Sequence, residues 1–147
     1  MKAFLVDDEF LQRKLVKKSV DWQSIGIELC GEAEDGEEAL EKIFMLKPDI
    51  LIMDINIPYV NGIEVSKRVK KVFPETQVII LTAYGEFEYA QKALRFGVFD
   101  YLLKPIDKNK LKACLDKAAA QITKEKEQKD NLAELTRLQI NEKTSCR

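Results

Sequence analysis

Histidine is absent from this chain of 147 residues. Without an imidazole there can be no Ser-His-Asp or Cys-His catalysis, no histidine general base and no zinc site that includes histidine. Cysteine is scarce too, because Cys30, Cys114 and Cys146 are far apart and form no Cys-x-x-Cys pair. We expect reduced thiols in a cytoplasmic protein, since disulfides are rare in that compartment.

Long apolar runs and an excess of charge of one sign are also missing. No apolar run approaches the roughly 18 residues of a membrane span, and Ala3–Val6 is too short for a signal peptide. Lys and Arg total 24 and Asp and Glu total 25, which argues against binding to nucleic acid by bulk charge. Apolar residues make up 46% of the chain, enough for the packed core of one ordinary domain.

The apolar pattern alternates between short runs typical of buried strands and stripes at helical spacing. The runs are Ala3–Val6, Ile27–Cys30, Ile50–Met53, Val78–Leu81 and Phe99–Leu103. The stripes that follow them are Leu11/Leu15, Ala39/Leu40/Ile43/Phe44, Val65/Val69/Val72/Phe73, Phe87/Ala90/Leu94 and Leu111/Cys114/Leu115/Ala118/Ile122. This (βα)5 order predicts an α/β fold, a doubly wound five-stranded parallel sheet of flavodoxin-like strand order 2-1-3-4-5.

The segment after Pro105 contains neither glycine nor proline. The fifth stripe predicts a helix to about Ile122, beyond which the polar run Thr123–Asn131 leads to Leu132, Leu135 and Leu138. A solvated tail and a continuous helix are both compatible with this composition, and the absence of breakers favours an extended C-terminal helix. We therefore expect a domain over 1–122 and, over 123–147, a helical linker with a short coiled coil.

Charged and polar side chains follow four of the predicted strands. Asp7 and Asp8 follow the first strand, Asp54 the third, Thr82 the fourth and Lys104 the fifth. Because the carboxyl ends of parallel strands meet at one edge of the sheet, these groups are expected in one crevice. A single aspartate there would be a helix cap, but capping does not explain the whole set. A dinucleotide site is disfavoured, because the first turn is acidic and lacks a Gly-rich motif.

The predicted carboxylate cluster requires a cation. Like charges about 4 Å apart repel by about 4 kcal/mol at an effective dielectric of 20. Ligands that are all oxygen, without histidine or cysteine, suit Mg²⁺. A carboxylate beside a divalent cation, a lysine and a hydroxyl is a site for phosphoryl transfer to the aspartate itself. Lys104 would pair with Asp54 and later with the added group, to which Thr82 would donate.

Four motifs resemble the receiver domain of two-component response regulators, over residues 2–122. They are Val6-Asp7-Asp8-Glu9, Met53-Asp54-Ile55-Asn56-Ile57-Pro58, Leu81-Thr82-Ala83 and Tyr101-Leu102-Leu103-Lys104-Pro105. The resemblance implies that Asp54 accepts a phosphoryl group from the phosphohistidine of a sensor histidine kinase. It implies that Asp8, Asp54 and the main-chain carbonyl of Asn56 bind Mg²⁺, with Asp7 assisting. It also implies a switch pair, Thr82 and Tyr101, and a cis peptide bond between Lys104 and Pro105.

Three further segments resemble receivers attached to AraC-type helix-turn-helix output domains. They are Asp21–Ile27, Tyr84–Ala90 and Asp100–Ile106. The expected output is transcription, through a DNA-binding domain that this chain does not contain, together with a homodimer on phosphorylation. The alternative is a stand-alone receiver that acts by docking to other proteins. A haloacid-dehalogenase-type phosphatase is disfavoured, because it needs an aspartate where Asn56 stands, so we expect a signalling domain and not a turnover enzyme.

Overall fold

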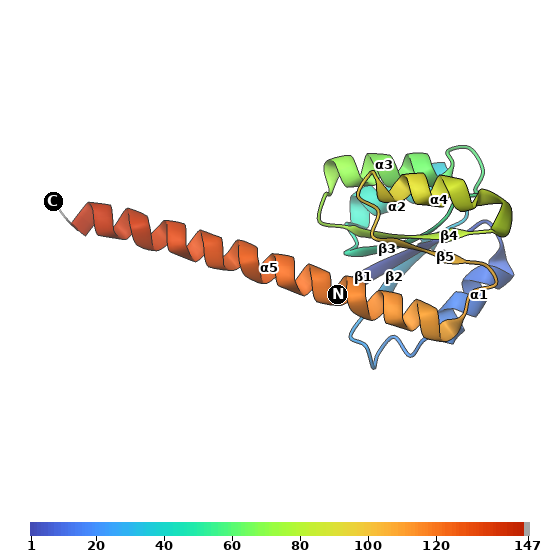
Figure 1. Cartoon of the computed structure of the whole chain (residues 1–147), viewed down its shortest axis with the longest axis horizontal. Coiled ribbons are helices and arrows are strands. Elements are labelled where there is room, and N and C mark those ends of the chain that lie inside the picture. The colour runs from blue at the N-terminus through green and yellow to red at the C-terminus, as the bar shows by residue number, and fades with distance from the viewer. Residues whose placement is uncertain (146–147) are drawn as a thin grey trace.

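Five parallel strands form one central sheet in the order β2-β1-β3-β4-β5 in this computed structural model, which describes residues 1–145 (Figure 1). The neighbouring pairs are all parallel. The strands are β1 (Lys2–Val6), β2 (Glu28–Ala33), β3 (Ile50–Asp54), β4 (Gln77–Thr82) and β5 (Asp100–Leu103). The predicted doubly wound sheet and its strand order are confirmed.

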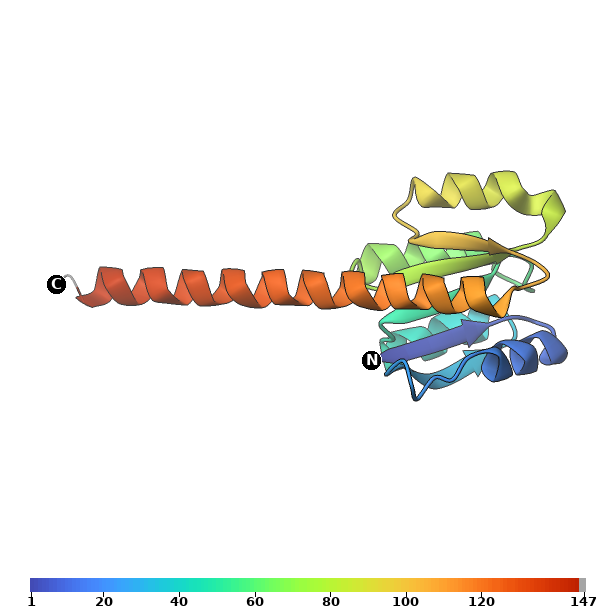
Figure 2. The same cartoon turned by 60° about the horizontal axis from the view of Figure 1, so that its bottom comes forward.

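Helices cover both faces of the sheet and enclose two apolar cores (Figures 1 and 2). One face carries α2 (Gly36–Leu46), α3 (Gly62–Val72) and α4 (Phe87–Leu94), the last preceded by the 3₁₀ turn η1 (Tyr84–Glu86). The other face carries α1 (Phe10–Ser19) and the first part of α5 (Lys108–Ser145). Strands β1, β3 and β4 lie between these layers and are almost wholly buried, which places their carboxyl ends together at one edge.

The edge strand β2 differs from its prediction, because it runs over Glu28–Ala33 and not Ile27–Cys30. It pairs on one side only, with β1, and most of it is half-buried, so polar residues such as Glu32 do not interrupt it. Gly31 is required by close packing, since a Cβ there would lie 2.9 Å from the ring of Phe4. A half-buried edge strand of this kind carries a weaker apolar signal than a strand buried on both faces.

Helix α1 turns a different face to the sheet from the one its leucines predict. Leu11 and Leu15 are 74% and 52% exposed, whereas Arg13 and Val16 are buried. The Leu11/Leu15 stripe therefore marks the helix but not the face that packs on the core. The guanidinium of Arg13 donates to the carbonyl of Asp7, and this contact accompanies the rotation that buries Val16 instead.

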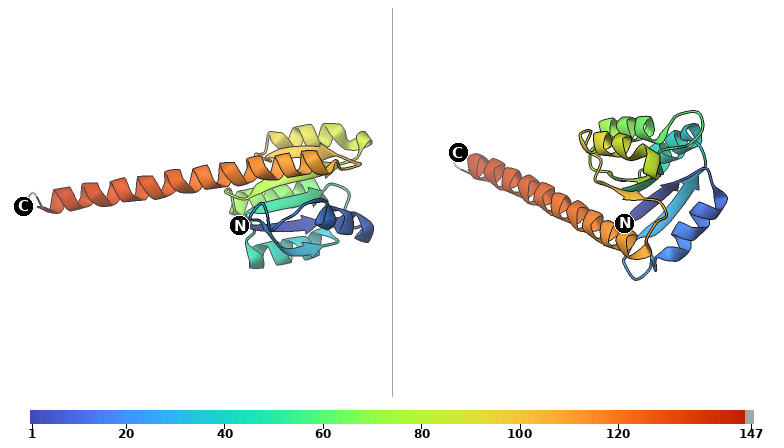
Figure 3. Two further views of the ribbon diagram at one scale, coloured as in Figure 1. Left: turned by 90° about the horizontal axis from the view of Figure 1, so that it is seen from below. Right: turned by 45° about the vertical axis from the view of Figure 1, so that its right-hand side comes forward.

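Helix α5 is continuous from Lys108 to Ser145, which confirms the extended C-terminal helix over the described residues; residues 146–147 of the predicted linker lie outside them. Its first part packs on the sheet through Leu111 and Leu115, and Ile122 is the last residue against that core. Beyond it the helix projects away from the domain (Figures 2 and 3). No helix in the described part of the chain is both long and apolar enough to span a membrane.

Candidate functional site

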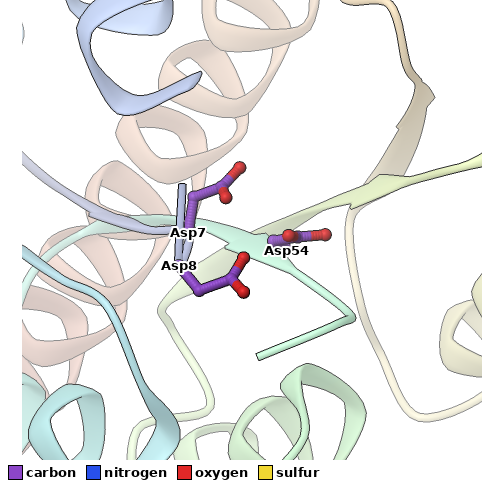
Figure 4. A group of neighbouring side chains, drawn as sticks. All are labelled: Asp7, Asp8 and Asp54. Atoms are coloured by element: carbon purple, nitrogen blue, oxygen red, sulfur yellow. The ribbon is translucent and has the colours of Figure 1, made fainter. Parts of the chain in front are cut away.

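Three carboxylates lie at the carboxyl edge of the sheet, where β1 and β3 end (Figure 4). Oxygen atoms of Asp7, Asp8 and Asp54 all lie within 4.8 Å of one another. Asp7 and Asp54 are only 1% and 3% exposed, whereas Asp8 is exposed. The structure thus brings together the three aspartates that the strand ends predict in one crevice.

Lys104 bridges the two buried carboxylates. Its Nζ lies 3.2 Å from Asp7 Oδ2 and 3.1 Å from Asp54 Oδ2. The backbone N–H of Lys104 donates to the carbonyl of Thr82, which extends the β4–β5 pairing up to the site. The Lys104–Pro105 peptide bond is cis, as the resemblance implies. Burial alone would lower the pKa of Lys104, but the charges of Asp54 and Asp7 outweigh it and raise that pKa above its usual range.

The carboxyl group of Asp54 is held in an unfavourable environment. Burial, and then the nearby charge of Asp7, raise its pKa from 3.8 to about 6, against the opposing effects of Lys104 and a backbone hydrogen bond from Asn56. A raised pKa means that the ionised form is destabilised. Since Lys104 offsets this only in part, the site would gain from a further positive charge.

The donors around this cluster fit a hard divalent cation. The three carboxylates supply only oxygen atoms, and Asn56 follows Asp54 closely enough in the chain to offer its carbonyl. The main chain is held close here, because a Cβ on Gly62 would lie 2.1 Å from the carbonyl oxygen of Asp54. The depression has a volume of about 490 Å³ and is lined by Asp8, Glu9, Asp54, Asn56, Ile57, Pro58, Ala83, Glu86 and Lys104.

Glu86 lines this depression and was missed by the sequence reasoning. It sits at the end of η1, and its carboxylate accepts a hydrogen bond from the side-chain amide of Asn56. The same pair also lines a groove of about 450 Å³ between α3 and α4, so it separates that groove from the acidic site. The sequence held only a weak signal for it, an acidic residue shortly after Thr82.

The predicted switch residues Thr82 and Tyr101 lie on neighbouring strands, β4 and β5. Thr82 is fully buried, and its hydroxyl donates to the carbonyl of Ala83 at 3.2 Å. The ring of Tyr101 is half-buried and packs edge-on against Phe87 of α4, with ring centroids 5.4 Å apart. In this arrangement the hydroxyl of Thr82 is engaged with the main chain, and Tyr101 belongs to the β5–α4 surface.

The sheet order, the acidic cluster and the bridging lysine define a receiver-type signalling domain. The model of the response regulator receiver domain family matches residues 3–116, and the chain belongs to that family. It is therefore a receiver domain of two-component signal transduction.

Relatives of the chain include both long regulators and a short one. The uncharacterized transcriptional regulatory protein YesN of Bacillus subtilis is 37% identical over 91% of this chain, which spans only 36% of YesN. The chemotaxis protein CheY of Thermotoga maritima is 34% identical over 80% of this chain and 97% of CheY. A solved structure of a two component transcriptional regulator AraC from Clostridium phytofermentans is 25% identical, with a TM-score of 0.77, over 87% of this chain and 98% of that one. The predicted likeness to receivers of AraC-type regulators is thus confirmed.

Proposed function

We propose that Asp54 is the phosphoacceptor of this receiver domain. The observation that carries the proposal is the position of Lys104, whose ammonium group lies within 3.2 Å of both buried carboxylates. A carboxylate oxygen of Asp54 would form the new P–O bond, while the P–N bond of a kinase phosphohistidine breaks and its imidazole takes a proton. Lys104 would then pair with the phosphoryl oxygens, which carry the charge that develops in the transfer.

The reaction depends in this proposal on Mg²⁺, held by Asp8, Asp54 and the carbonyl of Asn56, with Asp7 assisting. The all-oxygen donor set and the raised pKa of Asp54 support this assignment. The bound cation would neutralise charge on the phosphoryl group as it is transferred. Once phosphorylated, the domain acts as a signalling switch and not as an enzyme that turns over a substrate.

The conformational signal would pass through Thr82 and Tyr101. The hydroxyl of Thr82 would leave the carbonyl of Ala83 and donate to the phosphoryl group, and Tyr101 would move inward from its contact with Phe87. The two residues lie on adjacent paired strands, which supports a coupled movement. Such a change is a population shift between two packings of the β4–β5 edge.

The partner that supplies the phosphoryl group would be a sensor histidine kinase, and this pairing would place the chain in the cytoplasm. Several curated relatives are transcriptional regulatory proteins, and this chain spans only 36% to 51% of their length. We therefore propose that a DNA-binding output domain acts beyond a receiver domain of residues 1–122, joined by the helical linker 123–147. Ile122, the last residue of α5 packed on the core, supports that boundary.

The experiment that tests this proposal is phosphorylation with acetyl phosphate, followed by measurement of the intact mass. We expect an adduct of about 80 Da with Mg²⁺, no adduct in excess EDTA, and no adduct on Asp54→Asn. Asp116→Asn, an exposed aspartate on α5, is the matched control and should react as the unchanged protein does. An adduct that survives Asp54→Asn would overturn the assignment.

A further inference from the structure

Helix α1 buries a charged residue beside the acidic site. Arg13 is 7% exposed, and charged side chains are rarely buried unless they are paired. Its Nη1 donates to the main-chain carbonyl of Asp7 at 2.6 Å. Its Nε forms a long ion pair with Glu32 Oε1 at 3.6 Å, too far for a hydrogen bond, and has no hydrogen-bond partner among the described residues. The carbonyl of Asp7 is therefore the principal partner of this guanidinium.

Glu32 does not account for the burial of Arg13. Lys17 lies 2.6 Å from Glu32 Oε2, so this carboxylate has a closer cation than Arg13. The ring of Phe10 lies over the guanidinium, 5.8 Å from its central carbon, and lies on the same helix. Arg13 thus makes one short hydrogen bond, to the carbonyl of Asp7, and none through its Nε, so its position is explained best by that carbonyl.

The carbonyl of Asp7 belongs to the peptide that leads into Asp8. Asp8 is exposed, and within residues 1–145 no hydrogen bond or ion pair holds its carboxylate. The side chain of Asp7, in contrast, is held by Lys104 and accepts a hydrogen bond from the backbone N–H of Glu9. The position of the Asp8 carboxylate thus depends on the direction of the Asp7–Asp8 peptide.

We propose that Arg13 is a positioning residue for the divalent cation site. By fixing the Asp7–Asp8 peptide it holds the Asp8 carboxylate close to those of Asp7 and Asp54. The guanidinium bonds to a neutral carbonyl, so it takes up none of the three carboxylates that the cation needs. This inference rests on the Mg²⁺ site of the proposed function.

Positioning and simple charge predict opposite effects of removing Arg13. The guanidinium is a positive charge close to a cation site, so its loss alone would tighten Mg²⁺ binding. Loss of positioning would weaken it, because partners outside the first ligand shell change metal affinity by about 10–100-fold. The direction of the change therefore distinguishes the two roles.

The test is Mg²⁺ titration of the full chain by isothermal calorimetry, with Arg13→Met, Arg13→Lys and the control Glu32→Gln. We expect about tenfold weaker binding for Arg13→Met. Arg13→Lys should be intermediate, because lysine can donate one bond to the carbonyl but cannot reproduce the guanidinium fork. Glu32→Gln removes both ion pairs and keeps the carbonyl bond, so its Mg²⁺ affinity should be unchanged.

Denaturant unfolding in EDTA measures the structural cost of each variant separately. Mg²⁺ affinity that is unchanged or tighter in Arg13→Met would overturn the positioning role, whatever its stability. If Arg13→Met does not fold, Arg13→Lys decides by the same comparison with Glu32→Gln. Absence of Mg²⁺ binding by the unchanged protein would instead contradict the proposed function itself.

Discussion

Two regions of this protein reverse the usual distribution of side chains between interior and surface. At the carboxyl edge of the sheet, Asp7 and Asp54 are buried. On the projecting part of α5, Leu132, Leu135 and Leu138 are 66%, 58% and 53% exposed. Buried polar groups and clustered exposed apolar groups are the informative exceptions in a globular protein.

The two regions differ in what they lack. The buried carboxylates have a cation within the chain, Lys104, but the raised pKa of Asp54 shows that it does not fully balance them. The exposed leucines belong to neither apolar core, and a helix whose apolar side chains pack on no partner is marginal in water. One region is thus suited to a cation and a phosphoryl group, and we expect the other to be completed by a second copy of the chain.

Removing Lys104 should have the largest effect. Lys104→Met leaves two buried carboxylates without their cation, and breaking a buried ion pair costs about 3–5 kcal/mol. Because Lys104 is partly exposed, we expect a loss of about 3 kcal/mol in unfolding free energy at neutral pH in EDTA. Urea denaturation measures it, with the exposed Lys112→Met as control; equal stability of the two variants would contradict the account.

Removing the charge of Asp54 should have a smaller effect of opposite sign. Its folded pKa of about 6 lies above the ordinary 3.8, so the folded chain retains a proton that the unfolded chain has lost between these values. The tighter proton binding by folded Asp54 adds to the free energy of unfolding. This stabilisation is full below about pH 4 and is lost as the pH rises through about 6. We expect Asp54→Asn to gain about 2 kcal/mol at neutral pH and little at about pH 4.

Urea denaturation in EDTA across this pH range checks the Asp54 prediction. The exposed Asp116→Asn is the control and should follow the unchanged protein throughout. If the gain in unfolding free energy of Asp54→Asn over the unchanged protein grew as the pH fell, the prediction would be contradicted.

The exposed leucines should matter for association and not for folding. With beryllofluoride as a phosphoryl mimic, we expect the chain to dimerise more tightly than at rest. Alanine at all three leucines should weaken that dimer about tenfold, because the apolar stripe is short. Sedimentation measures it, against a control with alanine at the exposed polar positions Gln128, Asn131 and Glu134. If the leucine variant and the polar control had equal association constants, the leucines would not form the dimer contact and this part of the helix would only connect domains.

The smallest effect should come from an ion pair of the same chemistry outside the buried site. Lys129 lies 3.2 Å from Glu75, but the two side chains are 76% and 70% exposed. Exposed pairs contribute about 0.2–1 kcal/mol, and we expect Lys129→Met to lose less than about 0.5 kcal/mol. If Lys129→Met lost nearly as much unfolding free energy as Lys104→Met, burial could not explain why the Lys104 site is more important for stability.

The sequence predicted what depends on periodicity and on strand ends. The buried strands have continuous apolar runs, so the sequence predicts where they lie and which polar groups follow them. β3 is one residue longer than predicted, because Asp54 itself pairs in the ladder with Leu81. The convergence of Asp7, Asp54 and Lys104 then followed from the rule that parallel strands deliver their carboxyl ends to one edge.

The sequence could not predict contacts that depend on how elements rotate against one another. The stripe of the first helix contains Leu11, yet Leu11 is exposed, whereas Arg13 is buried and reaches the carbonyl of Asp7. Glu86, at the end of η1, accepts a hydrogen bond from Asn56, which follows β3, 30 positions earlier in the chain. Both contacts join residues of different loops or elements, and no spacing along the chain encodes them.

The most direct test of the central claim is to locate the phosphoryl group chemically. Borohydride reduces an aspartyl phosphate to homoserine, so peptide mapping after acetyl phosphate treatment identifies the modified residue. We expect homoserine at position 54, formed with Mg²⁺ and absent in EDTA. Homoserine at position 7 or 8, or equal labelling in EDTA, would contradict the central claim.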